Sequence, residues 1–251
     1  MRMTETAAII TGGASGLGET TARHFRAMGA QVTLLDRDAE RGQAIAAEIG
    51  AGFAETDVTD EASVAGAIAQ AKAAMGRITV AVNCAGIATG SKTLGRDGPH
   101  PLDAFQRTID INLVGTFNVA RLAAAEMAGN ASDEDGARGV IVNTASIAAF
   151  DGQKGQAAYA ASKGGIVGLT LPMARDLARD GIRVMAIAPG IFATPMMRGL
   201  PQEVQDSLAA EVTFPKRLGD AEEYARLAAF IVECGYLNGE VIRLDGALRM
   251  Q

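Results

Sequence analysis

Short runs of β-branched and aliphatic residues alternate along this chain with longer stretches of helix-compatible residues. The short runs predict buried strands, because strands that are covered on both faces are apolar throughout. They lie at residues 7–11, 31–35, 78–83, 139–146, 182–189 and 239–246, with a weaker one at 52–56. The longer stretches predict helices at residues 18–28, 39–49, 61–75, 102–127, 157–179 and 221–234.

This regular alternation predicts the fold class. Parallel strands need crossover connections, and right-handed βαβ crossovers place helices on both faces of the sheet. We therefore expect an α/β protein with a doubly wound parallel sheet of about seven strands. No repeat, low-complexity tract or linker divides the chain, so residues 1–251 are expected to form a single domain.

Three stretches rich in Gly, Pro and polar residues follow neither pattern: 88–101, 130–139 and 190–215. The last has prolines at 195, 201 and 215 and an apolar cluster, TPMMRGL, outside any predicted strand. Long loops of this kind often form lids or binding elements. We expect a substrate loop at about residues 190–215.

The segment IITGGASGLG follows the first predicted strand and opens the first predicted helix. Its glycines have the spacing G-x-x-x-G-x-G, which lets the backbone approach a pyrophosphate while N–H groups at the helix N-terminus point at the anion. A tight turn without a ligand is the alternative, but the position in the first βαβ unit favours a Rossmann-type dinucleotide site. The residues expected to line it are Gly12, Ser15, Gly16, Leu17 and Gly18.

Asp36 ends the second predicted strand, 18 residues after Gly18. A carboxylate at this place accepts hydrogen bonds from an adenosine ribose and repels a 2′-phosphate, which favours NAD over NADP. Helix capping is the alternative role, for which Asp38 is also available. Arg37 opposes the assignment of NAD, since it could partly neutralise Asp36.

Two later segments also end predicted strands and are expected at the cofactor. Asp57, with the adjacent Val58, could bond the adenine edge, although capping of the next helix is an alternative. The NCAG segment forms a small-residue turn that lets the backbone approach the cofactor, and it supplies Asn83, Ala85 and Gly86.

Tyr159 and Lys163, in QAAYAASKGGIVGLT, lie four residues apart and therefore on one face of the predicted helix. A phenol titrates near pH 10, so an isolated tyrosine is a poor base at neutral pH. An adjacent ammonium favours phenolate and is expected to lower the pKa of Tyr159, which would make it a general acid and base. Ser146, thirteen residues earlier, could bind the substrate oxygen, and Asn112 could hold a water or a backbone carbonyl that connects to Lys163.

The segments TGGASGLG, NCAG, YAASK and APG occur in this order, with Asn112 and Ser146 between the second and the third. This set resembles the short-chain dehydrogenase/reductase family over the whole chain. The resemblance implies a proton relay through Asn112, Ser146, Tyr159 and Lys163, with hydride passing to or from a nicotinamide. It also implies three further cofactor contacts: Lys163 with the nicotinamide ribose, Pro189 and Gly190 in the APG segment, and Thr194 with the carboxamide.

Longer segments, among them VAVNCAGIATGSKT, FQRTIDINLVGTFNVARL and LNGEVIRLDGALRM, resemble one group within that family. These are the type 2 3-hydroxyacyl-CoA dehydrogenases, also called type 10 17β-hydroxysteroid dehydrogenases. The resemblance implies reversible oxidation of an L-3-hydroxyacyl-CoA to the 3-oxoacyl-CoA by NAD, in a homotetramer. It places Gln153 beside the substrate oxygen, together with Ser146 and Tyr159. A steroid, a short-chain alcohol or a carrier-linked 3-oxoacyl group is the alternative substrate.

The apolar cluster of the loop gains a role under this hypothesis. Met196, Met197 and Leu200 suit an adaptable wall for an acyl chain, with core filling as the alternative.

Composition and charge limit the classes of binding partner and the cellular compartment that we expect. The formal net charge of -6 gives no electrostatic footprint for nucleic acid or an anionic membrane. No apolar run approaches the roughly 18 residues that span a bilayer, and the N-terminus enters an apolar strand almost at once, so a cytoplasmic protein is expected. Two distant cysteines, and two histidines without clustered carboxylates, predict neither a disulfide framework nor a metal site. The intact Asn–Ser–Tyr–Lys set argues against a non-catalytic cofactor sensor.

Overall fold

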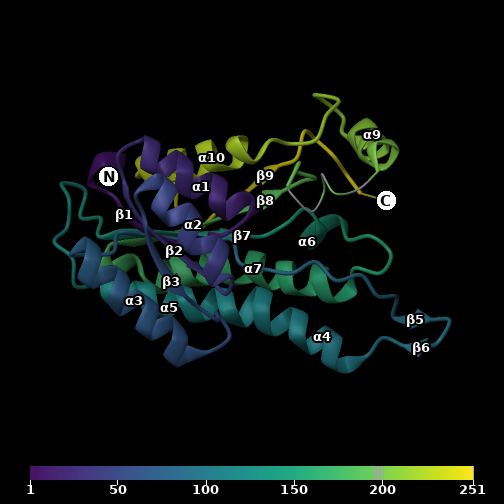
Figure 1. Cartoon of the computed structure of the whole chain (residues 1–251), viewed down its shortest axis with the longest axis horizontal. Coiled ribbons are helices and arrows are strands. Elements are labelled where there is room, and N and C mark those ends of the chain that lie inside the picture. The colour runs from purple at the N-terminus through teal and green to yellow at the C-terminus, as the bar shows by residue number, and fades with distance from the viewer. Residues whose placement is uncertain (195–196, 198, 200, 251) are drawn as a thin grey trace.

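Seven parallel strands form one sheet in the order β3-β2-β1-β4-β7-β8-β9 (Figure 1). Their bounds are β1 (Ala7–Thr11), β2 (Gln31–Asp36), β3 (Gly52–Glu55), β4 (Val80–Asn83), β7 (Gly139–Thr144), β8 (Ile182–Pro189) and β9 (Val241–Leu244). The structure is a computed structural model and describes residues 1–194, 197, 199 and 201–250. The strand order reverses between β1 and β4, and sheets of this kind bind ligands at such a point, beyond the carboxyl ends of the strands. The predicted α/β fold with a seven-stranded parallel sheet is confirmed.

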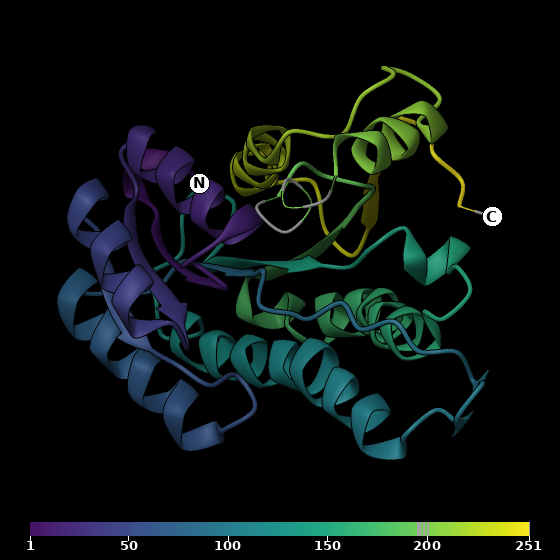
Figure 2. The same cartoon turned by 45° about the vertical axis from the view of Figure 1, so that its right-hand side comes forward.

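Helices cover both faces of the sheet (Figures 1 and 2). One layer is made by α1, α2 and α10 and packs on Ile10 and Val142, whereas the other is made by α3, α5 and α7 and packs on Ile9 and Ile141. These four isoleucine and valine side chains are fully buried, so successive strand residues point into two separate cores. The helix bounds are α1 (Gly16–Ala27), α2 (Ala39–Ile49), α3 (Glu61–Met75), α4 (Leu102–Ile109), α5 (Gly115–Met127), α6 (Ala148–Asp151), α7 (Ala157–Asp176), α9 (Gln202–Glu211) and α10 (Ala221–Glu233), with 3-10 turns at Met3–Glu5 and Ala178–Asp180.

Polar caps set where several helices begin. The carboxylates of Asp38 and Asp60 accept the N–H groups of Arg41 and Ser63, three residues into α2 and α3. Asp220 forms a reciprocal capping box with Glu223 at the start of α10. The helix starts therefore follow from local chemistry.

The long helix predicted at 102–127 is divided by one turn of π-helix. This turn spans Asp110–Val114, between α4 and α5, and contains the buried Asn112. Single π turns inside longer helices are frequent at functional sites because they redirect one side chain. The apolar pattern of the segment does not distinguish such a turn from a regular helix.

Several segments differ from the sequence prediction. The stretch at 190–215 contains α9, and the stretch at 88–101 contains a small hairpin of β5 (Leu94–Gly95) and β6 (Gly98–Pro99). No residue of α9 is buried, so this helix carries no apolar stripe that would have indicated it. The short α6 directly after the strand predicted at 139–146 was also not predicted, because its four residues are too few to show a periodicity.

Candidate active site

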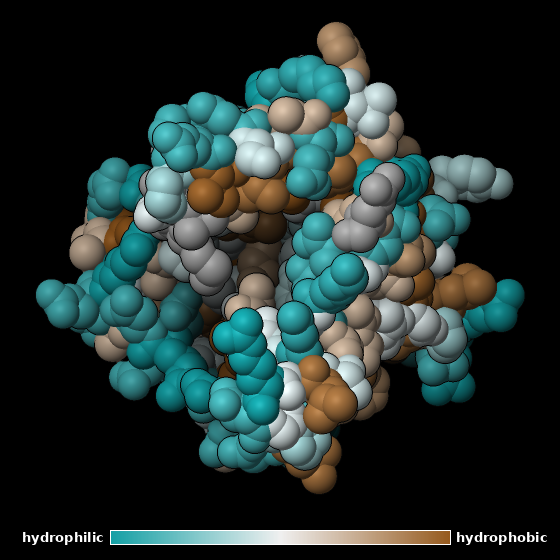
Figure 3. Space-filling view, turned by 90° about the vertical axis from the view of Figure 1, so that its right-hand side faces the viewer, coloured by the Kyte–Doolittle hydropathy of each residue, from teal (hydrophilic) through white to brown (hydrophobic). Residues whose placement is uncertain are grey.

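A cavity of about 660 Å³ opens at the carboxyl ends of the strands, where the strand order reverses. Figure 3 shows a hollow on this side of the molecule, with hydrophobic residues in its depth. Nearly all of the predicted site residues line this cavity: Gly12, Ser15, Gly16, Leu17, Gly18, Asp36, Asp57, Val58, Ala85, Gly86, Ser146, Gln153, Tyr159, Lys163, Pro189, Gly190 and Thr194. Asn83 and Asn112 are not among the lining residues and lie behind the wall.

The glycine turn is shaped so that only glycine fits at two positions. Gly12 has φ +65°, and a Cβ there would lie 2.9 Å from the Ala85 nitrogen. A Cβ on Gly18 would lie 2.2 Å from the Gly12 carbonyl oxygen. Ser15 is the N-cap residue of α1, and its side chain makes no capping hydrogen bond. The first N–H groups of α1 are therefore left for an anion in the cavity.

Asp36 joins the end of β2 to the glycine turn. Its carboxylate accepts the Ala14 N–H at 2.9 Å and the Asp38 N–H at 3.1 Å. Arg37 does not pair with it in this structure, since its guanidinium lies 3.6 Å from Asp57. The neutralisation of Asp36 that Arg37 could have caused is thus not seen.

Asp57 lies at the same end of the cavity. Its carboxylate accepts the hydroxyl and the N–H of Thr59, and these bonds, helped by Arg37, lower the pKa of Asp57. The N-cap of α3 is Asp60, so capping of that helix is not the role of Asp57.

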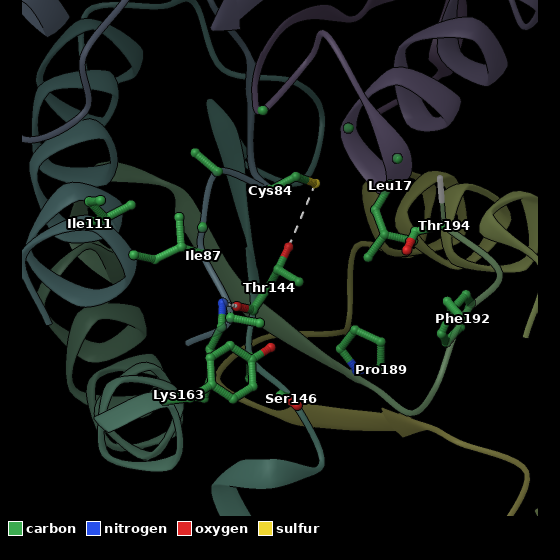
Figure 4. Close-up of a pocket in the computed structure, with 18 of the residues that line it drawn as sticks. Leu17, Cys84, Ile87, Ile111, Thr144, Ser146, Lys163, Pro189, Phe192 and Thr194 are labelled. Atoms are coloured by element: carbon green, nitrogen blue, oxygen red, sulfur yellow. Dashed lines mark hydrogen bonds between the residues drawn. The ribbon is translucent and has the colours of Figure 1, made fainter. Parts of the chain in front are cut away.

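Tyr159 and Lys163 lie one turn apart on α7, and Ser146 follows β7. The Lys163 Nζ donates to the Thr144 carbonyl at 2.7 Å and lies 5.8 Å from the centre of the Tyr159 ring (Figure 4). The Ser146 side chain is hydrogen-bonded to the phenol of Tyr159. The three side chains therefore meet at one end of the cavity.

Burial has the largest effect on the pKa values of Tyr159 and Lys163. It raises the pKa of Tyr159 above the ordinary value, against an opposing hydrogen bond from Ser146. Burial also lowers the pKa of Lys163 to about 8, against an opposing interaction with Cys84. The expectation that Lys163 lowers the pKa of Tyr159 is therefore wrong in direction. The ammonium bonds the Thr144 carbonyl, while loss of water around the phenol disfavours phenolate.

Asn112 holds the loop that follows β4. Its side chain accepts the Ile87 N–H at 2.8 Å and donates to the Ile87 carbonyl at 2.9 Å and to the Ser162 hydroxyl at 3.1 Å. A Cβ on Gly86 would lie 3.1 Å from the Asn112 Oδ1 and 3.7 Å from the Lys163 Nζ. Asn112 thus holds a backbone carbonyl, that of Ile87, on the segment that passes Lys163.

A chain of hydroxyl groups beneath Lys163 was not predicted from the sequence. The Thr144 hydroxyl lies 2.6 Å from the Asn83 carbonyl and 2.7 Å from the phenol of Tyr224, which is fully buried on α10. A carbonyl only accepts, so the Thr144 proton goes to Asn83, and the Tyr224 O–H donates to Thr144. The residue whose carbonyl holds Lys163 is therefore anchored through its side chain as well.

Asn83 belongs to the sheet and does not reach the cavity. Its amide nitrogen donates to the Asn143 Oδ1 at 2.9 Å, between the neighbouring strands β4 and β7. Its carbonyl accepts the Thr144 hydroxyl, so its contribution to the site is to fix Thr144.

Much of the remaining cavity wall is apolar, although Arg107 and Gln156 also belong to it, and most of these apolar residues carry no sequence motif. They include Ile111, Phe192, Met197, Leu208 and Met250. Met196 and Leu200, the other two members of the predicted apolar wall, lie outside the described residues. Only the general apolar character of the loop had indicated such a wall.

The described part of the chain holds no group of three or more His, Cys, Asp or Glu side chains that could bind a metal ion. Within those same residues, no helix is both long and apolar enough to cross a bilayer.

Comparisons with known proteins agree with this geometry. The family model for short chain dehydrogenase matches residues 6–205. The human protein named 3-hydroxyacyl-CoA dehydrogenase type-2 is 59% identical over 248 residues, which cover 97% of this chain and 95% of the human one. The Drosophila melanogaster protein of the same name is 54% identical over 246 residues, covering 96% of each chain.

A solved structure is also similar. The crystal structure titled as 3-hydroxyacyl-CoA dehydrogenase type-2 from Mycobacterium avium superposes with a TM-score of 0.95 at 48% identity, and covers 98% of this chain and 96% of that one. With the family match over residues 6–205 and the identities above, this chain belongs to the short-chain dehydrogenase family.

Proposed function

We propose that this chain catalyses the reversible, NAD-dependent oxidation of an L-3-hydroxyacyl-CoA to the 3-oxoacyl-CoA. The observation that carries the proposal is the 59% identity to the human 3-hydroxyacyl-CoA dehydrogenase type-2 over 97% of this chain. The cavity supports it, because it has a dinucleotide-type glycine turn at one end and Ser146, Tyr159 and Lys163 at the other.

The residues present fit NAD. The glycine turn, where a Cβ would collide with the backbone, and the N-terminus of α1 would hold the pyrophosphate. Asp36 would bind the adenosine ribose and repel a 2′-phosphate, while Asp57, Val58, Ala85 and Gly86 would flank the adenosine half. Lys163, Pro189, Gly190 and Thr194 would surround the nicotinamide half. When bound, the nicotinamide accepts or donates the hydride.

Tyr159 is the proton donor and acceptor in this proposal. Because burial raises its pKa, the phenol keeps its proton at neutral pH and can give it to the carbonyl oxygen of a 3-oxoacyl substrate. Ser146, hydrogen-bonded to the phenol, would hold that oxygen in reach, and Gln153 lies in the same wall. In the direction of oxidation Tyr159 would start as the phenolate and take the proton of the substrate hydroxyl, so its own proton must leave beforehand. The neutral form of Lys163, whose pKa is about 8, would be the acceptor of that proton.

The apolar half of the cavity would take the acyl chain. Phe192, Met197, Leu208 and Met250 line it, and methionine side chains adapt to ligands of different length.

The test is reduction of acetoacetyl-CoA by NADH, followed by the loss of nicotinamide absorbance. Tyr159→Phe removes only the hydroxyl and should lower kcat by about a hundredfold or more while the NADH Kd stays within about threefold. Tyr236→Phe is the matched control, because Tyr236 is fully exposed, and it should leave both values unchanged. Unchanged turnover in Tyr159→Phe would contradict the catalytic assignment. Faster turnover of a steroid or a carrier-linked substrate would instead assign a different alcohol.

We also propose a homotetramer in the cytoplasm. Val114 on the π turn, Phe117 on α5 and Leu171 on α7 expose large apolar side chains, which suits burial against a second copy. Cys84 and Cys234 are both free thiols, which fits a reducing compartment. Sedimentation at micromolar concentration tests the assembly, and a monomer would contradict it.

A further inference from the structure

The C-terminal segment makes a tight turn at Asp245–Leu248, directly after β9. The Leu248 N–H donates to the Asp245 carbonyl at 3.0 Å. Both central residues have positive φ, +58° at Gly246 and +62° at Ala247. Ala247 is the only non-glycine residue with positive φ in the described part of the chain. A Cβ makes this conformation unfavourable, so neighbouring contacts must hold the turn.

Two guanidinium groups hold both ends of this turn, those of Arg249 and Arg243. The Arg249 Nη1 donates to the Asp245 Oδ2 at 3.1 Å and to the Leu248 carbonyl at 2.7 Å. The Arg243 Nε donates to the Asp245 Oδ2 at 2.7 Å, and its Nη2 donates to the Leu248 carbonyl at 3.1 Å. The other oxygen of Asp245 accepts the Ala247 N–H at 2.9 Å. The Asp245 side chain is only 7% exposed, so this is not a freely solvated surface pair.

The Arg243 guanidinium also joins the turn to α6. Its Nη2 also donates to Asp151, and its Cζ lies 5.2 Å from the centre of the Phe150 ring. Phe150 and Asp151 end α6, the short helix between Ser146 and Gln153, both of which line the cavity. Arg243 therefore connects the C-terminal segment to the wall that carries two of the proposed substrate contacts.

The turn contacts two more parts of the cavity wall. The Phe214 N–H donates to the Gly246 carbonyl at 3.1 Å, and the Thr213 hydroxyl donates to the Ala247 carbonyl at 3.0 Å, just after α9. A Cβ on Gly190 would lie 2.9 Å from the Asp245 Cα, so the loop after β8 also packs on the turn. Figures 1 and 2 show the C-terminal end beside α9, and Met250 itself lines the cavity.

We propose that Arg243 is a positioning residue that sets the preference of this site for acyl-chain length. By bracing the turn at Asp245–Leu248 against α6, it holds Met250 at the cavity as part of the apolar wall. This inference rests on the proposed function, since it needs an acyl substrate. Arg243 does not line the cavity, so it acts through the segments that it joins.

The test compares 3-oxoacyl-CoA substrates of four and ten carbons in the Arg243→Met protein. Methionine keeps much of the side-chain length but removes the Nε and Nη2 donors, which bond Asp245, the Leu248 carbonyl and Asp151. For the ten-carbon substrate KM should rise about tenfold, the effect of losing contact with about two methylene groups. For the four-carbon substrate KM, kcat and the NADH Kd should stay within about twofold, because the proton-transfer residues are untouched.

Three further variants sharpen the result. Arg243→Lys keeps the charge but loses the planar guanidinium with its several donors. Its KM for the ten-carbon substrate should therefore fall between those of the unsubstituted protein and Arg243→Met. Asp151→Ala removes the acceptor on α6 and leaves the turn contacts of Arg243 in place, so it should also raise KM for the ten-carbon substrate, including where Arg243→Met does not fold. Arg2→Met is the matched control, because Arg2 is 79% exposed, pairs with Glu5 before the start of β1 and does not line the cavity.

The outcomes separate this inference from the proposed function. Equal effects on both chain lengths, or no effect on either, would overturn the role in chain-length preference. If the unsubstituted protein turns over no acyl-CoA, the proposed function fails. Hydrogen exchange then decides the bracing role: faster exchange at both 148–153 and 245–250 in Arg243→Met supports it, and unchanged exchange refutes it.

Discussion

The Lys163 ammonium is buried almost completely away from water, and this burial lowers the free energy of unfolding. The residue is 5% exposed, and burial lowers its pKa from 10.5 to about 8. Between these two pH values the unfolded chain binds more protons than the folded protein, so stability rises with pH across that window. Below pH 8 both states hold a charged lysine and the cost is complete, about 3 kcal/mol at pH 7. At pH 9.5 it falls to about 1 kcal/mol by the same relation.

Lys163→Met replaces the ammonium with an apolar side chain of similar length. The Thr144 carbonyl loses its 2.7 Å partner, which costs about 1 kcal/mol. The variant should therefore be more stable than the unsubstituted protein by about 2 kcal/mol at pH 7, about equally stable at pH 9.5, and catalytically impaired at both. Urea unfolding at one fixed protein concentration gives the free energy of unfolding at each pH.

Lys92→Met is the control for this experiment, because Lys92 is exposed on the loop before β5. It should show the same pH dependence of stability as the unsubstituted protein. The reasoning would be refuted if the stability difference between Lys163→Met and the unsubstituted protein were the same at pH 7 and pH 9.5. A constant difference would mean that the folded protein does not depress the pKa of Lys163.

Four other substitutions test separate parts of the structure. Gly18→Ala puts a Cβ 2.2 Å from a backbone oxygen and should abolish NADH binding and lower Tm sharply. Gly66→Ala, in α3 with no atom within 4 Å of the added Cβ, should instead raise the free energy of unfolding by about 0.5–1 kcal/mol. Similar effects of the two substitutions in thermal unfolding would contradict this. Tyr224→Phe removes the donor to Thr144 and should cost about 1 kcal/mol in urea unfolding, and no measurable loss would show that the hydroxyl chain is not formed. Asp36→Ala should lower the ratio of kcat/KM for NADH over NADPH by about tenfold or more, and an unchanged ratio would remove Asp36 from cofactor selection.

Much of the fold could be predicted because its signals are local. A strand that is buried on both faces is apolar throughout, and β1, β7 and β8 have every residue buried. The glycine turn could be recognised because Gly12 and Gly18 have no space for a Cβ. The spacing of Tyr159 and Lys163 predicted a shared helix face, and the structure places both at the cavity.

The failures concern properties that depend on distant parts of the chain. Tyr224 reaches Thr144 from 80 residues away, and no spacing rule connects them. Met250 lines the cavity only because a turn with two positive φ angles brings it there. The pKa of Tyr159 was predicted in the wrong direction because the argument counted a neighbouring charge and omitted desolvation, which needs the burial of the folded protein.

The hydroxyl chain from Tyr224 through Thr144 to Asn83 ties α10 to the carboxyl ends of the paired strands β7 and β4. It joins three buried residues at the base of the cavity, whereas α9 at the rim is mostly exposed. The segments at the cavity entrance, such as α9, can therefore change to suit substrates of different size without widening the cavity at its base. A protein built in this way can acquire new substrates through substitutions in α9 and the C-terminal segment. The distance between its proton donor and its cofactor site then stays the same.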